Sequence, residues 1–178
     1  ELYVSSDQAA HVFEAIAEAG DGPGLKLCGL HALDSCRIEK AFRHFGHDIT
    51  DEDHVLEAGL GFAVKTKKSE FIGRDAVLRM KREGPPRRLV QFLLEDPEPL
   101  LFHNEAIRRD GDIVGTLTSG NYGHHLGGAV GLGYVPCAGE SEEEVLASAY
   151  EIEIAGTRVK ARASLKPLYD PAAERVRA

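Results

Sequence analysis

Residues 29–65 read GLHALDSCRIEKAFRHFGHDITDEDHVLEAGLGFAVK, and this stretch says more about fold and function than any other part of the chain. It predicts a helix over about 29–45, which Gly46 breaks, because glycine destabilises helices. An acidic loop that contains histidines follows, and the stretch ends in a short apolar run. Arg37 and Glu39 lie on the helix just before the break, where charged groups commonly line the edge of a pocket.

The composition limits the class of protein. The chain has 178 residues with 43% hydrophobic and 28% charged residues, which is typical of a globular protein with one large domain or two small ones. The net charge of −8 argues against nucleic acid or an anionic membrane as a partner. There is neither an apolar run of about 18 residues nor a signal peptide, so we expect a cytoplasmic protein without a membrane span.

The cysteines and the first residues give two further expectations. Cys28, Cys36 and Cys137 are odd in number and lack CxxC spacing, which predicts reduced, buried thiols in a cytosol-like compartment. The chain lacks an initiator Met and begins with Leu2–Val4, a short apolar run that reads as a strand. We therefore expect a fragment of a longer polypeptide.

Apolar residues at helical spacing predict three helices in the first half. Ser5–Asp7 can cap the first helix, which Gly20 would end. A third, charged helix is predicted over 74–83, and residues 62–64 could form a strand. The candidate core contacts of the helix over 29–45 are Leu30, Leu33, Ile38 and Ala41.

The Gly84-Pro85-Pro86 sequence marks a boundary, after which the pattern predicts an all-β half. Residues 89–94 read as a strand, and Arg108-Arg109-Asp110-Gly111 reads as the turn of a hairpin. Glycines alternate with apolar residues over 128–135, so another strand should pack close to them. Acidic residues alternate with apolar ones over 150–154, and basic residues alternate with apolar ones over 158–162. Acids on one strand that face bases on the next predict a second hairpin, as part of a small barrel or sandwich.

The acidic loop has two interpretations. Imidazoles and carboxylates together suit a divalent metal, yet their spacing matches neither a helical His pair nor an EF-hand, so the pattern favours a solvated loop without a metal. The residues concerned are His44, His47, Asp48, Asp51, Asp53 and His54.

Other candidate chemistry is sparse. No phosphate-binding glycine motif and no GxSxG is present, and His124-His125 reads as a surface or packing pair. A nucleophilic Cys36 is possible, but a buried helical cysteine is the favoured interpretation. Arg37 has two open interpretations. It could form a structural salt bridge to Glu39, Asp34 or another acid, or its guanidinium fork could bind a ligand carboxylate or a polar ring edge.

Several ordered motifs resemble one family. Residues 33–65 resemble the segment RDxLRLEAG…LYGxD(I/M)…P.EAGLGW.V of the glycine-cleavage T-proteins (aminomethyltransferases), and residues 70–76, EFIGRDA, resemble the family's DFIGREAL. Residues 115–120, GTLTSG, match a further family motif. Residues 166–171, KPLYDP, are closer to the dimethylglycine and sarcosine dehydrogenase branch, where the same module is fused behind a flavin oxidoreductase.

The resemblance implies an α+β fold in which residues 1–84 complete a folate-binding domain with a linker helix and residues 87–171 form a C-terminal antiparallel β-barrel. It implies tetrahydrofolate as the cofactor and transfer of a one-carbon (aminomethyl) unit to it, giving 5,10-methylenetetrahydrofolate. The carbon would come from a lipoyl carrier protein or, as an iminium, from an upstream flavin domain. FAD is expected only if the parent protein has that domain.

The resemblance also implies site residues. Arg37 matches the family's folate-site arginine, and Phe45 stands where T-proteins have a tyrosine, so stacking could remain without the hydroxyl contact. Tyr169 lies near the C-terminal segment that reaches back to the folate site. The family's pterin-binding acid and its catalytic Asp fall upstream of Glu1. The resemblance therefore assigns no catalytic residue and no metal ligand here, and it implies that the fragment alone is inactive.

Three alternatives to an aminomethyltransferase stay open. The chain could be the folate module of a flavin-dependent dimethylglycine or sarcosine dehydrogenase or oxidase, or it could belong to a non-catalytic folate-binding protein. S- or O-demethylation onto folate is a more remote possibility. A homodimer through an open sheet edge is a further expectation for such a half-domain.

Overall fold

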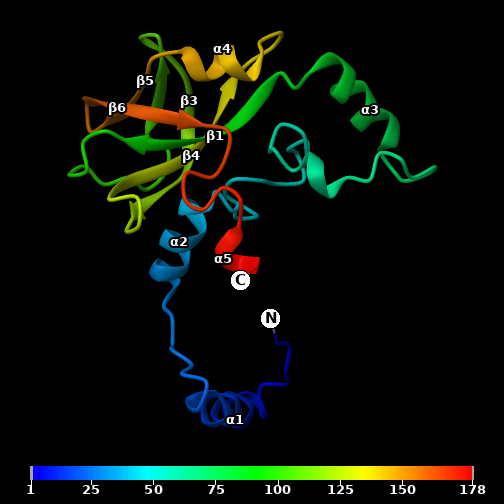
Figure 1. Ribbon diagram of the computed structural model, residues 1–178, viewed down its shortest axis with the longest axis vertical. Coiled ribbons are helices and arrows are strands. Elements are labelled where there is room, and N and C mark those ends of the chain that lie inside the picture. Colours follow the sequence, from blue (N-terminus) through cyan, green and yellow to red (C-terminus); the bar gives the residue numbers. More distant parts are fainter. Residues whose placement is uncertain (1, 178) are drawn as a thin grey trace. The chain divides into compact units, whose positions relative to one another are not determined.

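The computed structural model describes residues 2–177 (Figure 1). The chain divides into two compact units, of which the first ends at Ala32 and the second begins at Leu33. The first unit contains helix α1 (Ala9–Asp21), and the second contains every strand. None of the helices in the described residues is long and apolar enough to cross a membrane.

Helix α1 confirms the predicted periodicity, but its ends differ from the prediction. It starts after Gln8, whose side chain makes no capping hydrogen bond, so Ser5–Asp7 do not cap it. It continues past Gly20 to Asp21, with Gly22 as the C-cap residue. The strand predicted at Leu2–Val4 is wrong, since residues 2–4 do not belong to any strand of the described chain.

Helix α2 (Leu30–Glu39) is shorter than the expected 29–45 helix. It ends before Ala41, whose φ of 52° is incompatible with an α-helix. Ile38 and Ala41 are buried as predicted, at 0% and 5% exposure. Leu30 and Leu33 are not core residues, because they are 81% and 55% exposed and only the last part of α2 packs against the strands.

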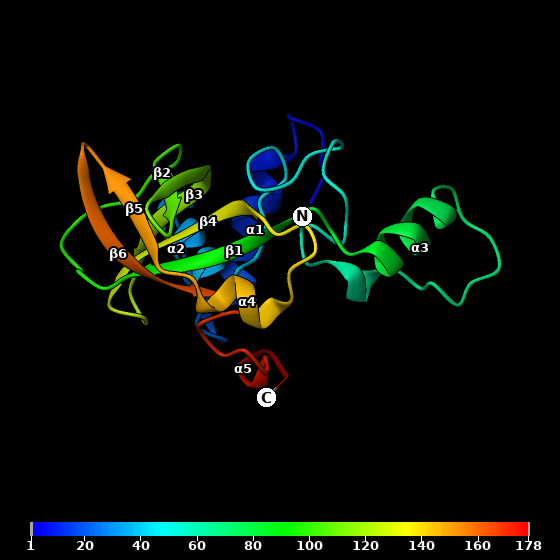
Figure 2. The same ribbon diagram turned by 90° about the horizontal axis from the view of Figure 1, so that it is seen from above.

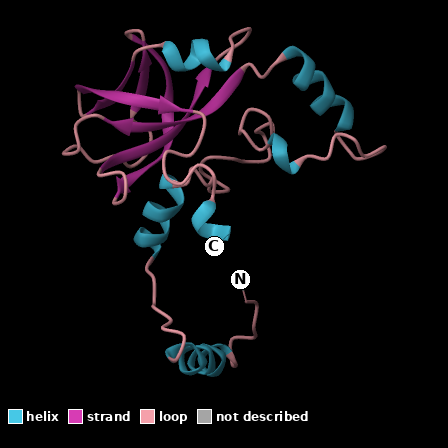
Figure 3. Ribbon diagram, viewed as in Figure 1, coloured by secondary structure: helices cyan, strands magenta, loops and turns pink. Residues whose placement is uncertain are grey.

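The chain between α2 and α3 is mostly loop, interrupted by the 3-10 helix η1 (Gly61–Ala63) (Figure 3). The strand predicted over 62–64 is therefore wrong, and Phe62 is 85% exposed. Helix α3 (Arg74–Glu83) has the predicted ends, and Gly84 stops it with a φ of 82°. Figures 1 and 2 show α3 standing away from the strands.

Six antiparallel strands close into a barrel in the order β1-β4-β3-β2-β5-β6. This confirms an α+β fold with an antiparallel barrel after Pro86. The strands are β1 (Arg87–Leu94), β2 (Ala106–Arg109), β3 (Asp112–Gly123), β4 (Gly128–Pro136), β5 (Tyr150–Ile154) and β6 (Thr157–Ser164).

Both predicted hairpins are present. The turn between β2 and β3 places Asp110 and Gly111 at φ values of 54° and 98°, which Asp and Gly tolerate. Across β5 and β6, Glu151 faces Lys160 and Glu153 faces Arg158. Opposite charges on neighbouring strands thus form the solvated face that the alternation predicts.

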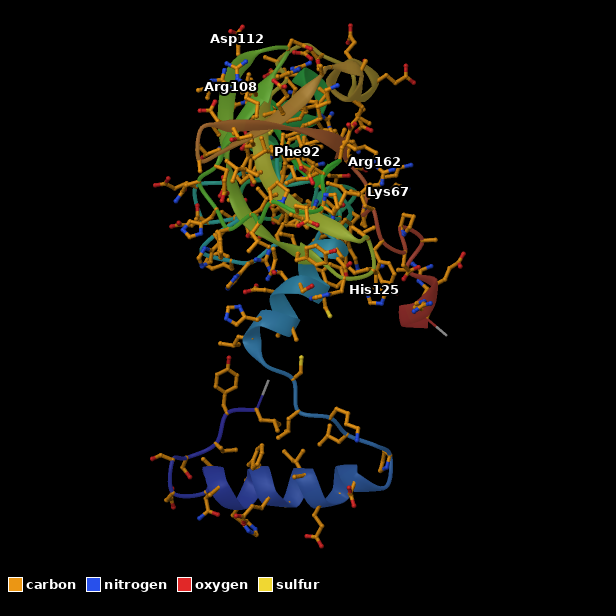
Figure 4. All side chains as sticks on the ribbon, turned by 90° about the vertical axis from the view of Figure 1, so that its left-hand side faces the viewer. Lys67, Phe92, Arg108, Asp112, His125 and Arg162 are labelled. Atoms are coloured by element: carbon orange, nitrogen blue, oxygen red, sulfur yellow. The ribbon has the colours of Figure 1, made fainter. Side chains whose placement is uncertain are left out.

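The barrel interior is filled by apolar side chains around Phe92, which is fully buried (Figure 4). The predicted close approach to the glycines of β4 is confirmed. A Cβ on Gly133 would lie 2.5 Å from Ile107 Cδ1 and 2.8 Å from the Thr116 carbonyl oxygen. Only glycine fits there without displacing the neighbouring strand.

Two helices depart from the all-β prediction for the second half. Helix α4 (Glu142–Ala147) starts with a capping box in which Ser141 and Glu144 bond each other's backbone N–H groups. Serine followed three residues later by glutamate was a readable signal for this helix. Helix α5 (Glu174–Arg177) follows the C-terminal segment over 165–173.

Candidate functional site

The end of α2 lies against the barrel and carries the charged residues singled out in the sequence. Ser35, Ile38 and Glu39 are buried because spacings of three and four residues put them on one helix face. Cys36 and Cys28 are exposed, so of the three predicted buried thiols only Cys137 is buried. Cys36 follows Ser35 by one residue, which turns it off the buried face.

Arg37 forms the structural salt bridge that was one of its two interpretations. Its Nε–H donates to Asp34 Oδ1 over 2.9 Å, and its Nη1 donates to Asp48 Oδ2 over 2.7 Å and to the Phe42 carbonyl oxygen over 3.4 Å. Its Nη2 donates to Ser119 Oγ over 3.0 Å. Within the described residues, four of the five guanidinium N–H groups are thus used, and one Nη2 N–H is left. The side chain keeps 14% exposure.

Asp48 is the hub of this network, not part of a solvated loop as predicted. Its side chain is fully buried, with 0% exposure. Oδ2 accepts from Arg37 and, over 2.8 Å, from the His44 backbone N–H, while Oδ1 accepts from Thr118 Oγ1 over 2.6 Å. A buried carboxylate needs such donors, because the charge loses its water. Asp48 therefore fixes the loop to α2 and β3, although the hydrophilic sequence around it predicted a solvated side chain.

Tyr134 binds the backbone of the same residue, Asp48. Its hydroxyl donates to the backbone oxygen of Asp48 over 3.0 Å, and the Arg87 guanidinium lies 4.4 Å from its ring centroid. Burial, with Asp53 adding to it, raises the pKa of Tyr134 to about 12. The hydroxyl therefore stays protonated near neutral pH and remains a donor.

Glu39 holds the loop that carries the histidine pair. Its Oε1 accepts from the backbone N–H groups of His125 and Leu126 over 2.6 and 3.0 Å, and its Oε2 lies 3.1 Å from His125 Nδ1. The Glu39 side chain is 2% exposed, whereas that of His125 is 52% exposed, which confirms its surface position (Figure 4). Glu39 was noticed as a charged residue, but nothing in its spacing showed that it binds two backbone amides.

The C-terminal segment returns to the end of α2 and brings Tyr169 there. The Tyr169 backbone N–H donates to the Glu39 carbonyl oxygen over 3.3 Å, and its ring lies 4.5 Å from that of His125. Lys40 Nζ donates to both the backbone oxygen and Oδ2 of Asp170, over 2.5 and 3.1 Å. The Lys40–Asp170 pair was not predicted, because its members are 130 residues apart.

Phe45 presents its ring to solvent beside this network. It is 70% exposed, although its backbone is fixed by a bridge to Ile49. Among the described residues, the ring makes no aromatic contact. Phe45 follows His44, whose backbone N–H binds Asp48, so its backbone is next to the Arg37 network in the sequence, and its exposed ring is free to stack on a ligand.

The end of α2 therefore gathers Arg37, Tyr169 and the loop of Phe45 around two buried carboxylates, Asp48 and Glu39. The described residues contain no group of three or more His, Cys, Asp or Glu side chains arranged to hold a metal ion. The site offers a cation with one free donor, an exposed aromatic ring and a tyrosine. Such a surface suits a flat, polar organic ligand better than an ion.

Comparison with known families assigns the chain to one of them. A family described as "Glycine cleavage T-protein C-terminal barrel domain" matches residues 87–170, and one described as "GCVT N-terminal domain" matches residues 1–68. The chain belongs to the glycine cleavage T-protein family.

Two curated relatives represent both branches that the sequence suggested. The chain is 44% identical over 178 residues to 4-methylaminobutanoate oxidase (formaldehyde-forming) of Paenarthrobacter nicotinovorans, covering 99% of this chain and 21% of the relative. It is 40% identical over 171 residues to an aminomethyltransferase of Symbiobacterium thermophilum, covering 95% of this chain and 44% of the relative. The chain thus spans less than half of either relative.

A solved structure shows the same fold. The glycine cleavage system aminomethyltransferase T from Bartonella henselae superposes with a TM-score of 0.75 at 26% identity, covering 90% of this chain and 45% of that one. The architecture of helices followed by a closed barrel is therefore that of aminomethyltransferases.

Proposed function

We propose that this chain supplies part of the tetrahydrofolate pocket of a protein that transfers a one-carbon unit to folate, giving 5,10-methylenetetrahydrofolate. In this proposal residues 1–84 complete a folate-binding domain and residues 87–171 form the barrel behind it. Membership of the T-protein family supports the reaction class. The observation that carries the assignment to this site is that the end of α2 holds Arg37 and binds both the loop of Phe45, through Asp48, and the backbone of Tyr169, through Glu39.

The residues present suit a folate. The unused Nη2 N–H of Arg37 can donate to a carbonyl or ring nitrogen, because guanidinium recognises polar ring edges. The exposed ring of Phe45 can stack on a flat heterocycle. Tyr169, held by the backbone of Glu39, places a second aromatic ring at the same helix end.

In this account Arg37 orients the folate and transfers no proton, since guanidinium stays charged at any working pH. Asp48 is also unsuited to act as a base, because both of its oxygens already accept hydrogen bonds from Arg37 and Thr118. In this proposal the chain therefore binds and positions the folate, and a carboxylate elsewhere in the protein performs proton transfer. We accordingly expect this chain alone to be inactive.

The second candidate is the folate module of a flavin-dependent N-methyl amine dehydrogenase or oxidase. The specific support is the 44% identity to 4-methylaminobutanoate oxidase over nearly the whole chain. In that case an oxidised amine delivers the carbon as an iminium and FAD is held by another domain. In the first candidate a lipoyl carrier protein delivers it. A flavin-binding GxGxxG in the parent gene would favour the oxidase.

Binding of tetrahydrofolate tests the shared part of both candidates. Calorimetric titration of the protein that carries this chain should show saturable binding to tetrahydrofolate. Absence of one-carbon transfer with retained binding would favour a non-catalytic folate-binding protein. Absence of binding would contradict the proposal.

The three free cysteines support a cytosol-like compartment as the place where the protein acts.

A further inference from the structure

Arg43 is a partly buried cation without an acidic partner in the described chain. Its Nε–H donates to the Ala58 carbonyl oxygen over 2.9 Å, and its Nη1 donates to the Ala41 carbonyl oxygen over 2.8 Å. Both acceptors are neutral. Burial lowers the pKa of Arg43, and the charges of Tyr134 and Asp48 only oppose this change. A buried charge is normally paired, so Arg43 is an unusual feature of this fold.

The unused side of Arg43 meets a cavity of about 510 Å³. Gly59 lines the same cavity, and a Cβ at that position would lie 2.7 Å from Arg43 Nη2. Glycine therefore leaves space at the end of the guanidinium where no hydrogen-bond acceptor of the described residues lies. The apolar part of the lining comes from four leucines, namely Leu56, Leu89, Leu146 and Leu165.

The acids of this cavity are mostly engaged with other cations. Glu57 accepts from Arg87 over 3.2 Å, and Glu142 accepts from Arg88 over 3.1 Å. Glu143 is exposed at the rim. Lys166, which also lines the cavity, has no acidic partner among the described residues. Two cations, Arg43 and Lys166, thus face the cavity without a counter-charge of their own.

We propose that this cavity binds an amphipathic monocarboxylate, with the carboxylate on Arg43 and an aliphatic chain against the four leucines. Guanidinium forms strong, charge-assisted hydrogen bonds with carboxylates. Cavities of about 300–1,000 Å³ with apolar walls and few polar groups are typical of small-molecule sites. The lining contains neither Arg37 nor Phe45 nor Tyr169, so the proposal stands independently of the folate assignment.

Octanoate is a suitable probe, and octan-1-ol is its uncharged counterpart. Titration by NMR should show saturable octanoate binding with a Kd of about 1 mM. The methyl resonances of Leu146 and Leu165 should shift, and binding of octan-1-ol should be at least about tenfold weaker. Arg43→Gln should weaken octanoate binding by about tenfold or more. The matched control is Arg158→Gln on β6, which faces Glu153 and does not line the cavity, and it should leave affinity unchanged.

A second variant covers the case in which Arg43→Gln does not fold, since Arg43 also bridges two backbone carbonyls. Leu146 is 41% exposed, so Leu146→Glu should fold and weaken octanoate binding by placing an acid in the wall. Three results would each overturn the proposal. They are no saturable octanoate binding up to about 10 mM, equal affinity for octan-1-ol, and unchanged affinity in folded Arg43→Gln or Leu146→Glu protein.

Discussion

Arg37 Nη1 donates to Asp48 Oδ2 across 2.7 Å, and this bond ties the end of α2 to the loop that follows it. Thr118 and Ser119 on β3 bind the same two side chains, over 2.6 and 3.0 Å. Two stretches that resemble separate family motifs, residues 33–65 and 115–120, therefore meet at one buried ion pair. The pair fixes the helix end, the loop of Phe45 and the barrel relative to one another within the second unit.

Asp48→Asn should destabilise the protein by about 3 kcal/mol, because it leaves Arg37 partly buried with less counter-charge. Urea unfolding measures this change. Asp51→Asn is the matched control, since Asp51 is exposed and should change stability by less than about 0.5 kcal/mol. Equal stability of the two variants would show that Asp48 is not the hub described here.

Gly133→Ala should cost about 2–3 kcal/mol, because the added Cβ would lie 2.8 Å from the Thr116 carbonyl oxygen of the neighbouring strand. Gly128→Ala on the same strand is the control. There the nearest atom, Leu93 Cδ1, lies 3.3 Å away and belongs to a flexible side chain, so the cost should be below about 1 kcal/mol. Thermal unfolding of both variants compares them, and a larger loss for Gly128→Ala would refute the packing argument.

Asp170 should titrate below the usual aspartate pKa of 3.8. Burial alone would raise the pKa of Asp170, but the hydrogen bonds from Lys40 and from the Glu174 backbone N–H outweigh it. Because the folded pKa is depressed, this group stabilises the fold above the unfolded pKa of about 3.9. That stability is lost as pH falls through the lower folded pKa.

NMR titration of the Asp170 carboxyl carbon measures this directly. Lys40→Met should raise the pKa of Asp170, because it removes the charge-assisted hydrogen bond. A native Asp170 midpoint at or above the usual aspartate value of 3.8 would rule out the attachment of the C-terminal segment by Lys40.

Local patterns predicted the barrel half well. The charge alternation on β5 and β6, the Asp110-Gly111 turn and the glycines of β4 each follow from backbone geometry that a few neighbouring residues determine. Helix α4 was missed although its capping box was readable at Ser141.

The site was harder to predict, because its bonds join distant parts of the chain. Asp48 sits in a hydrophilic stretch and looks hydrated until its partner Thr118, 70 residues away, is known. Leu30 and Leu33 have core-like spacing but remain exposed, since periodicity shows which face is apolar and not whether anything covers it. Arg37 was singled out from its pattern and assigned to folate by resemblance. A salt bridge to Asp34 was one interpretation of the sequence, whereas the pair with the buried Asp48 is visible only in three dimensions.

The central claim is that folate binds beside Arg37 and Phe45. Calorimetric titration with tetrahydrofolate should compare the native protein with Arg37→Ala and Phe45→Ala, and with Phe102→Ala as the control. Phe45 and Phe102 are 70% and 66% exposed, so neither truncation should unfold the protein. Circular dichroism would confirm that the Arg37 variant, which loses its ion pairs, remains folded.

The account predicts that Phe45→Ala and folded Arg37→Ala each weaken tetrahydrofolate binding by about tenfold, which is the loss of one stacking or charged contact. Phe102→Ala should bind as the native protein does. Unchanged affinity in both Phe45→Ala and folded Arg37→Ala would contradict the assignment of this site to folate.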